Sequence, residues 1–406
     1  RFQEATSICS ATEMAPPAAL RRRIQAQAAA AAKADDHSDV PWHSMGRKVA
    51  VVAALLVFSL CWLAVWLTRL GSASVLDEPP GPEVAELLGQ ADLAIRQLYN
   101  YTLALEHLGL ALDLAPRNAA VMKFYATVLL ALGRVAEAHG HLRAVFRSGV
   151  SAAQDAHFLQ QYVLALHRLE ARAELEEAWP AVTRLAGLGW RSPMQCPDIV
   201  DVSLLDDAVP FPEPKGLRVA QLMAAHSAEI LAEFRAFQQQ PGWDSPSRFS
   251  PNQDNDLVLG NDPRRWTEML LFDRGTWQPR GCKLLPTACK ALQGLLEVEG
   301  IAHGKRSGQV SLLKLEAGTS LVPHFGSVNW RYTAHLGLAV PEGVVMYAGN
   351  ESRSFVQGEV LVLDDSFLHS VEHGGQGPRV TLFANFFHPK VEPMTHEDWL
   401  LSRHAD

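Results

Sequence analysis

An uninterrupted apolar run near the N-terminus constrains this chain more than any other feature. Val49–Leu67 spans nineteen residues without a charge, and Ser59 is its polar interruption. A helix of this length can cross a hydrocarbon core of about 30 Å. The run is apolar on every face, which disfavours a buried helix of a soluble domain. It also starts late, which makes a cleaved signal peptide the weaker alternative. The sequence therefore predicts a transmembrane helix over 49–69.

Basic residues around this run give its direction. Those that precede it are Arg21, Arg22, Arg23, Lys33, Arg47 and Lys48. Arg69 alone follows closely. Because loops rich in Lys and Arg stay in the cytosol, we expect a cytosolic tail over 1–48 and a type II membrane protein. Its bulk would then face the endoplasmic reticulum or secretory-pathway lumen. Residues 1–13 precede the first methionine and are given no structural role, and both an untranslated leader and a fragment remain open.

The charge balance excludes one class of function. The 406 residues include 36 Lys or Arg and 44 Asp or Glu, a net charge of −8. Dedicated nucleic-acid binders usually carry a basic surface, so no nucleic-acid partner is expected. Cys282 and Cys289 lie seven residues apart. In an oxidising lumen they form either a short-loop disulfide or two buried thiols, and spacing alone does not decide.

After a linker over 70–82, residues 83–190 show helical periodicity and an internal repeat. Five residues recur in kind 34 positions later in the same order. The first set is Phe124, Leu130, Ala131, Leu132 and Arg134, and the second is Phe158, Leu164, Ala165, Leu166 and Arg168. This period is typical of tetratricopeptide (TPR) helix pairs. We therefore predict a TPR-like α-helical domain. A concave peptide-binding surface and a packing spacer are both open as its role.

The remainder of the chain changes character. Residues 191–216 are rich in proline and are expected to form a linker or a wrapped segment. One amphipathic helix is expected over 219–239. After Gly308 the periodicity shifts to two, in short segments separated by turn residues. The predicted fold is thus multidomain α + β: a transmembrane helix, a TPR-like region and a C-terminal jelly roll.

Four ordered motifs in this C-terminal region resemble the aspartyl/asparaginyl β-hydroxylase family. They are GTSLVPHFG, RYTAHLGLAVPEG, GEVLVLDDSFLHSVEH and GPRVTLFANFFHP, between 318 and 389. The resemblance implies a double-stranded β-helix of the cupin-like kind over 217–406. It also implies Fe(II), 2-oxoglutarate and O₂ as cofactor and co-substrates. Animal members are similar in having a type II anchor, TPR repeats and a disulfide with the spacing of Cys282 and Cys289.

Site residues follow from the matched motifs. His324 and His369 resemble the two iron ligands, and such oxygenases usually add a carboxylate two residues after the first His. That position is Gly326 here, as in the family. Arg379 resembles the Arg that binds 2-oxoglutarate, and a planar guanidinium suits a carboxylate. His335 is implied to help hold the co-substrate. The implied reaction hydroxylates the β-carbon of Asp or Asn, in EGF-like domains in animals.

Two positions depart from the family's pattern. Thr333 stands where many animal members have a second Arg, and Leu313 stands where they have a Ser. Arg331 is a possible compensating cation. Asp364 and Asp365 are expected to form a turn that positions His369. Two alternatives remain open: a related oxygenase acting on a lipid or another side chain, and a catalytically inactive TPR scaffold.

Overall fold

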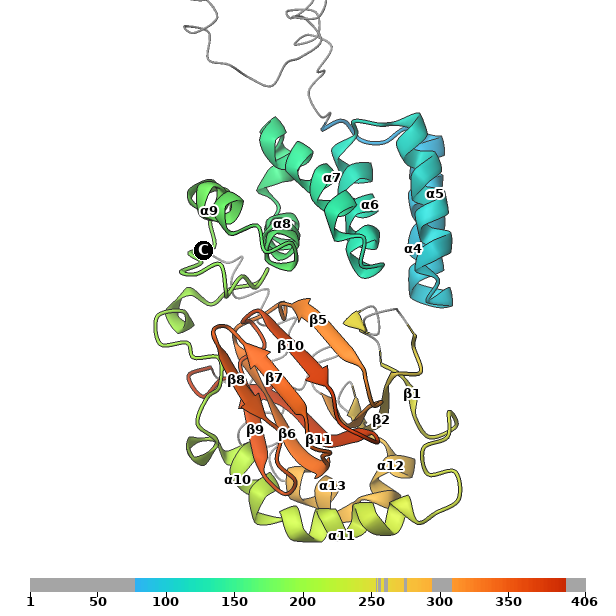
Figure 1. The fold of residues 1–406 in the computed structure, drawn as a ribbon, viewed down its shortest axis with the longest axis vertical. Coiled ribbons are helices and arrows are strands. Elements are labelled where there is room, and N and C mark those ends of the chain that lie inside the picture. The colour runs from blue at the N-terminus through green and yellow to red at the C-terminus, as the bar shows by residue number, and fades with distance from the viewer. Residues whose placement is uncertain are drawn as a thin grey trace, which may run out of the picture. The chain divides into compact units, whose positions relative to one another are not determined.

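The computed structural model describes residues 77–252, 254, 257–258, 262–273, 276–293 and 309–391 (Figure 1). These residues belong to one compact unit, Val75–Asp406. The predicted cytosolic tail and transmembrane helix lie outside the described residues, as does most of the linker over 70–82. Among the helices that are described, none is long and apolar enough to cross a membrane.

Six helices form the N-terminal part of this unit. They are α4 (Pro82–Leu98), α5 (Tyr101–Leu114), α6 (Ala119–Ala131), α7 (Val135–Ser148), α8 (Ala156–Arg168) and α9 (Arg172–Ala186). Each contacts the next along the chain. Alanines such as Ala126 and Ala165 are fully buried where helices meet, because a small side chain allows a close approach. The helical region predicted from periodicity is therefore present, and its assignment as TPR-like stays a prediction.

Side-chain caps start three of these helices. The Oδ1 atoms of Asn100 and Asn118 accept hydrogen bonds from the amides of Leu103 and Val121. Asp155 caps α8 in the same manner. Such caps satisfy amides that have no partner within the helix. The 34-residue repeat relates α6 to α8, which hold equivalent places in successive helix pairs.

The proline-rich segment 191–216 lies against the sheet domain. The Met194 carbonyl accepts from the Leu368 amide over 2.8 Å, and the Pro210 carbonyl accepts from the Asp364 amide over 3.0 Å. Gln195 donates from Nε2 to Ser366 Oγ. Two short 3-10 turns, η2 (Val202–Leu204) and η3 (Pro214–Gly216), interrupt the segment. Of the two alternatives for this segment, the contacts favour the wrapped one.

Four helices precede or interrupt the strands. They are α10 (Arg218–Ala225), α11 (Ser227–Gln238), α12 (Pro279–Leu284) and α13 (Pro286–Gln293). The prediction of a single helix over 219–239 was wrong in one respect. The helix is broken at His226, which ends α10 and has a non-helical backbone with φ −102° and ψ 10°. The break lets Met223 and Phe234 both reach the core. Cys282 and Cys289 form a disulfide with an S–S distance of 2.08 Å that joins α12 to α13.

Two antiparallel sheets make up the C-terminal part. The larger has the order β1-β2-β4-β11-β6-β9, with β3 beside β2, and the smaller has the order β5-β10-β7-β8. The larger sheet contains β1 (Ser250–Pro251), β2 (Trp266–Asp273), β3 (Thr276–Trp277), β4 (Gln309–Leu315), β6 (Arg331–Ala339), β9 (Val360–Leu363) and β11 (Arg379–Phe387). The smaller contains β5 (Ser320–His324), β7 (Val344–Ala348), β8 (Glu351–Ser354) and β10 (His369–His373).

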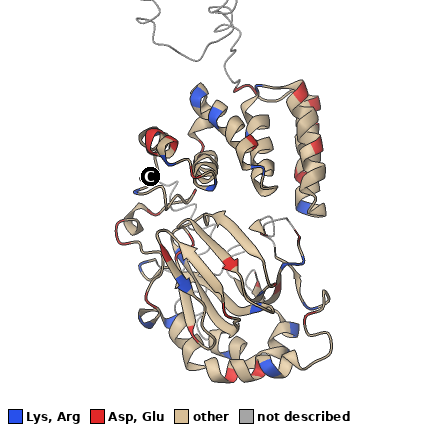
Figure 2. Cartoon of the chain, in the orientation of Figure 1, with Lys and Arg blue, Asp and Glu red and all other residues tan. Residues whose placement is uncertain are grey.

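The large sheet has two different faces because side chains alternate along a strand. Leu312, Leu336 and Leu382 point outward and pack with α10, α11 and α13, which lie along that face (Figure 1). The opposite face turns toward the small sheet. We call the space between the two sheets the cup. Most strand residues carry no charge, whereas Lys, Arg, Asp and Glu concentrate on helices and loops (Figure 2).

Candidate active site

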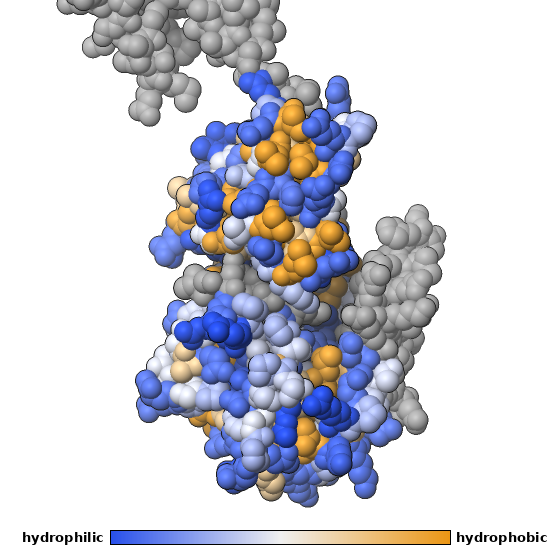
Figure 3. Space-filling model, turned by 90° about the vertical axis from the view of Figure 1, so that its right-hand side faces the viewer, coloured by the Kyte–Doolittle hydropathy of each residue, from blue (hydrophilic) through white to orange (hydrophobic). Residues whose placement is uncertain are grey.

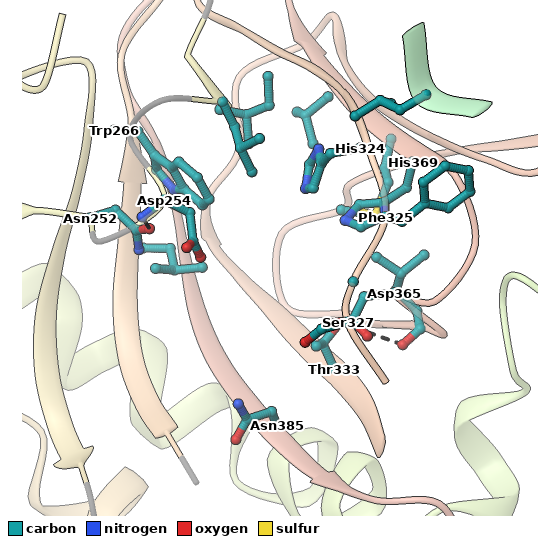
Figure 4. Close-up of a pocket in the computed structure, with 18 of the residues that line it drawn as sticks. Asn252, Asp254, Trp266, His324, Phe325, Ser327, Thr333, Asp365, His369 and Asn385 are labelled. Carbon is teal, nitrogen blue, oxygen red and sulfur yellow. Dashed lines mark hydrogen bonds between the residues drawn. The ribbon is translucent and has the colours of Figure 1, made fainter. Parts of the chain in front are cut away.

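Two histidines from the small sheet face each other across adjacent strands. His324 ends β5 and His369 begins β10, and they are direct partners in the antiparallel register. Their ring centroids are 4.0 Å apart. Figure 4 shows the two rings side by side on one wall of the cavity. Strand pairing therefore brings together residues that are 45 positions apart in the sequence.

Both rings are held in the state that a metal requires. Nδ1 of His324 lies 2.7 Å from the Val322 carbonyl, and Nδ1 of His369 lies 2.8 Å from the Phe367 carbonyl. A carbonyl only accepts, so each Nδ1 carries the proton and each Nε2 keeps its lone pair. Burial lowers the pKa of both rings, and for His324 the neighbouring His369 adds to the effect. The pair is thus neutral and can ligate a cation.

No side chain at residue 326 could supply a third ligand. A Cβ atom built on Gly326 would lie 2.8 Å from Cγ, from Oδ1 and from the main-chain oxygen of Asp365. Asp365 fills this space, and its carbonyl accepts from the Gly326 amide over 2.6 Å. Its Oδ2 is 3.3 Å from Nη2 of Arg331. Within the described part of the chain, no group of three His, Cys, Asp or Glu side chains is arranged to hold a metal.

Asp365 therefore differs from its neighbour Asp364. Oδ1 of Asp364 accepts from the amide and hydroxyl of Ser366, as a turn residue does. Burial raises the pKa of Asp364 to about 8. Asp365 instead lines the cavity, and its Oδ1 is buried without a hydrogen-bond partner in the described structure. The turn expected for both residues is present, since the Phe367 amide donates to the Asp364 carbonyl over 3.3 Å, and Asp365 also faces the cavity.

The large sheet contributes a buried cation. Arg379 is 2% exposed, and its Nε has no hydrogen-bond partner among the described residues. Its guanidinium carbon lies 4.9 Å from the centroid of the Phe355 ring. Burial lowers the pKa of Arg379 to about 10, so the group remains charged at neutral pH. A buried charge without a counter-ion is costly, and an anionic ligand would relieve that cost.

His335, Thr333 and Arg331 lie on β6, on the face that also lines the cavity. Burial and the charge of Arg379 lower the pKa of His335 to about 3, so its ring is neutral. Its Nδ1 has no partner among the residues described. Oγ1 of Thr333 is 3.4 Å from Nε2 of His335 and 3.5 Å from the Leu363 carbonyl. Arg331 pairs with Asp365 and adds a cation at the edge of the cup.

These groups share one cavity of about 890 Å³. His324 and His369 stand on one wall, and Trp266, Asn252 and Asp254 stand on the opposite one (Figure 4). The helical region closes a further side through α6 and α8. The residues contributed from there are Thr127, Leu130, Ala131, His157, Gln160, Gln161, Leu164 and Arg168. The side chain of Arg168 donates to the Pro323 carbonyl beside His324 and to the Leu130 carbonyl.

The structure brings together every predicted metal and co-substrate residue. The sequence did not reveal the part played by Asp365, the ring of Phe355 over Arg379, or the helical wall of the cavity. Each depends on contacts between elements far apart in the chain. For the helical wall the sequence offered one signal, Arg168. It was noted only as a repeat position, and no role in the site was predicted for it.

Comparison with known proteins shows which family the sheet domain is similar to. The profile described as "Aspartyl/Asparaginyl beta-hydroxylase" matches residues 224–389. "Aspartate beta-hydroxylase domain-containing protein 1" of Mus musculus is 34% identical over 140 residues, which is 32% of this chain and 38% of that protein. "Aspartyl/asparaginyl beta-hydroxylase" of Mus musculus is 32% identical over 146 residues, 36% of this chain and 19% of that protein.

Residues 224–389 of this chain are thus similar to the aspartyl/asparaginyl β-hydroxylase family, and the resemblance predicted from the motifs is confirmed. The chain matches less than two fifths of the length of these two relatives. A solved oxidoreductase of the "2OG-Fe(II) oxygenase family, from Burkholderia pseudomallei" is a weak likeness. It is 14% identical, has a TM-score of 0.27, and covers 43% of this chain and 94% of that chain.

Proposed function

We propose that this protein is a 2-oxoglutarate- and iron(II)-dependent dioxygenase that hydroxylates the β-carbon of Asp or Asn side chains. The observation that carries the proposal is the convergence, in one cavity, of two neutral imidazoles with a buried guanidinium whose Nε has no partner among the described residues. The imidazoles suit iron(II), and the guanidinium suits the distal carboxylate of 2-oxoglutarate. The family of the sheet domain supports the same chemistry.

In this proposal each residue has a separate task. His324 and His369 hold the metal through Nε2. Bound iron(II) would supply the activation of O₂, with 2-oxoglutarate as co-substrate converted to succinate and CO₂. Arg379 holds the distal carboxylate, and His335 offers a neutral ring nitrogen beside it. Arg331 and Thr333 complete the polar wall on β6. The pocket walls from both sheets exclude water from the reacting groups.

The two-histidine set leaves the charge of iron(II) without a protein carboxylate bound to it. Anionic ligands would then be favoured at the metal. Asp365 lies in the same cavity and already pairs with Arg331. Its carboxylate therefore offsets part of the positive charge, although residue 326 supplies no carboxylate ligand. We take this balance to favour 2-oxoglutarate as a dianion.

Substrate, location and domain layout complete the proposal. A lumenal or secreted protein with an Asp or Asn target, such as an EGF-like domain, would place that side chain in the cavity between the two sheets and the helices α6 and α8. The Cys282–Cys289 disulfide favours an oxidising compartment. We keep the predicted layout: a type II anchor over 49–69, a TPR-like domain over 83–190, and a double-stranded β-helix of the jelly-roll kind within 217–406.

The test is anaerobic loading of the purified chain with iron(II) and 2-oxoglutarate, followed by air and measurement of succinate. We expect the wild type to release succinate and His369→Ala to release none. His226→Ala, a change at a partly exposed residue between α10 and α11 that does not line the cavity, is the matched control and should behave as the wild type. A wild type that binds neither ligand would favour the inactive scaffold.

The choice of substrate needs a second measurement. Peptides from EGF-like domains that gain the mass of one oxygen atom at an Asp or Asn would support protein β-hydroxylation. Succinate release that is stimulated by a lipid, with no oxygen added to any peptide, would instead support the alternative of a lipid-directed oxygenase. A gain of oxygen on a different side chain would identify the other variant of that alternative.

A further inference from the structure

The two imidazoles of the cup are supported to different degrees by the strands around them. His369 begins β10, an interior strand that pairs with β5 on one side and with β7 on the other. His324 ends β5, which is an edge strand of the same sheet. An edge strand is held by a full ladder on one side only, so His324 needs support that the sheet already gives to His369.

The ladder that reaches His324 is also irregular. The register of β5 against β10 slips by one residue just before His324, so Val322 and Pro323 together face one residue of β10. A β-bulge of this kind leaves the extra residue unpaired, and proline has no amide hydrogen to donate to a ladder. Pairing with β10 is therefore weakest in the segment that carries the first imidazole.

A side chain from the helical region binds this same segment. Arg168 is the last residue of α8. Its Nε donates to the Pro323 carbonyl over 2.9 Å, and its Nη1 donates to the Leu130 carbonyl, near the end of α6, over 3.0 Å. A guanidinium is a planar, rigid donor. The two hydrogen bonds therefore tie the residue before His324 to the ends of two helices.

The residue after His324 is held by the helical region as well. Phe325 packs against the hydrophobic cluster that α6, α7, α8 and α9 share. Its ring centroid lies 6.4 Å from that of His167 on α8, in an edge-to-face arrangement. Figure 4 shows Phe325 beside the two imidazoles. His324 is thus flanked on both sides by residues that contact α8.

We propose that Arg168 is a positioning residue for the metal site. It anchors the Pro323 carbonyl and so keeps the His324 ring at the separation from His369 that a shared ion requires. This inference rests on the proposed function, because it takes the two imidazoles to be metal ligands. Groups that orient metal ligands typically contribute about 10-fold to 100-fold to metal affinity. The helical region then belongs to the metal site through a residue that is not itself a ligand.

The charge of Arg168 allows positioning to be distinguished from a purely electrostatic influence. Arg168 lines the same cavity as the two imidazoles, and a guanidinium repels a metal cation. If its charge were the main influence, Arg168→Met would strengthen iron(II) binding. Positioning predicts the opposite, because methionine keeps an aliphatic side chain but has neither donor. The direction of the change in affinity therefore separates the two.

The experiment measures the iron(II) dissociation constant of the full chain anaerobically, by competition with a chromophoric chelator. Arg168→Met should raise this constant by about tenfold to hundredfold. Arg134→Met is the matched control, because Arg134 holds the equivalent position 34 residues earlier, pairs with Glu137 and does not line the cavity. Leu142→Ala, in the core of the helical region, controls for a general loss of stability. Both controls should stay within about threefold of the wild type.

A second readout follows the ligand geometry itself. Cobalt(II) bound to Arg168→Met should give a visible absorption spectrum different from that of the wild type, because His324 is displaced, whereas Leu142→Ala should match the wild type. Unchanged or stronger iron(II) binding in Arg168→Met, or an unchanged cobalt(II) spectrum, overturns the inference and leaves the proposed function intact. A loss of equal size in either control also overturns it, since stability would then be the cause. A wild type that binds no iron(II) overturns the proposed function itself.

Discussion

Buried polar side chains have different neighbours in the helical region and in the cup. In the helical region, Nε2 of His139 and Nε of Arg143 are buried, and both lie near the Glu174 carboxylate, at 3.3 and 3.0 Å. In the cup, Nε of Arg379 is buried with no hydrogen-bond partner among the described residues. The buried nitrogens of the first region thus lie beside a carboxylate of the chain, whereas Arg379 in the second lies beside none among the described residues.

The outer surface of the helical region shows a second contrast. Hydrophobic residues gather on the face presented in Figure 3. Those exposed on α4 and α5 are Leu93, Leu98, Leu110 and Leu114. The cup instead places its hydrophobic residues around charged groups, as Phe355 lies over Arg379. The charged groups of the site are thus enclosed by apolar side chains, and this low-dielectric environment strengthens each electrostatic contact there.

The largest expected effect is at Arg379. Arg379→Met should weaken 2-oxoglutarate binding by about 3 to 5 kcal/mol, because a buried, hydrogen-bonded charge pair is lost. The melting temperature of the ligand-free protein should hold or rise, since an unpaired buried charge is removed. Titration calorimetry and thermal melting measure the two quantities. A large drop in melting temperature without 2-oxoglutarate would remove the contrast between the two regions.

Next in size is a core change in the helical region. Leu142 in α7 is 1% exposed, and Leu142→Ala should lower the free energy of unfolding by about 3 kcal/mol by creating a cavity. The affinity of the folded protein for 2-oxoglutarate should not change. Leu110→Ala on the exposed face of α5 is the matched control and should cost less than about 0.5 kcal/mol. Denaturant titration measures both, and a fall in affinity would show that the regions are coupled.

A pH-dependent effect of intermediate size is expected at Glu268 on β2. Burial raises the pKa of this carboxyl from 4.5 to about 7, and Asp254 and Asp273 act in the same direction. A group with a raised folded pKa stabilises the fold below its unfolded pKa, and this contribution is lost as the pH rises through its folded pKa. Stability should therefore fall between about pH 4.5 and pH 7 through this group.

Glu268→Gln tests this directly, because the amide mimics the protonated acid and can still accept from Asn252 and Gln309. We expect the variant to gain about 2 kcal/mol near pH 8 and almost nothing near pH 4.5. Unfolding curves at a series of pH values measure the difference. A gain that is the same at every pH would mean that the carboxyl does not titrate in the folded protein.

The smallest effect is at a helix cap. Asn118→Ala should cost about 1 kcal/mol, because the Val121 amide loses its acceptor. Asn118→Ser should restore most of that stability, and neither change should alter 2-oxoglutarate binding. Thermal melting and the same titration measure these outcomes. Loss of binding in Asn118→Ala would show that the helical wall of the cavity depends on this cap.

The sequence predicted much of the fold, but not every strand. Strands β4, β6, β7, β9 and β11 lie within segments whose period-two pattern was visible. β5 contains Pro323, which is tolerated because β5 lies at the edge of its sheet. β8 is exposed along its whole length, so it lacks an apolar pattern. β10 alternates buried and less buried residues, but it begins and ends with histidine, and its pairing with β5 and β7 makes it a strand.

The site was predictable as far as the motifs reached. His324, His369, Arg379 and His335 were predicted, since each lies in a matched segment. The exclusion of a side chain at Gly326 by Asp365 was not, because it depends on a contact between residues 39 positions apart. The hydrogen bond from Arg168 to the Pro323 carbonyl was hidden for the same reason, since it joins residues 155 positions apart.

Iron binding tests the central claim most directly. Anaerobic equilibrium dialysis of the full chain against iron(II), followed by metal analysis, gives the number of ions bound. The account predicts one tightly bound iron(II) per chain in the wild type and none in the double variant His324→Ala/His369→Ala. Equal iron content in both proteins, or none in the wild type, would contradict it.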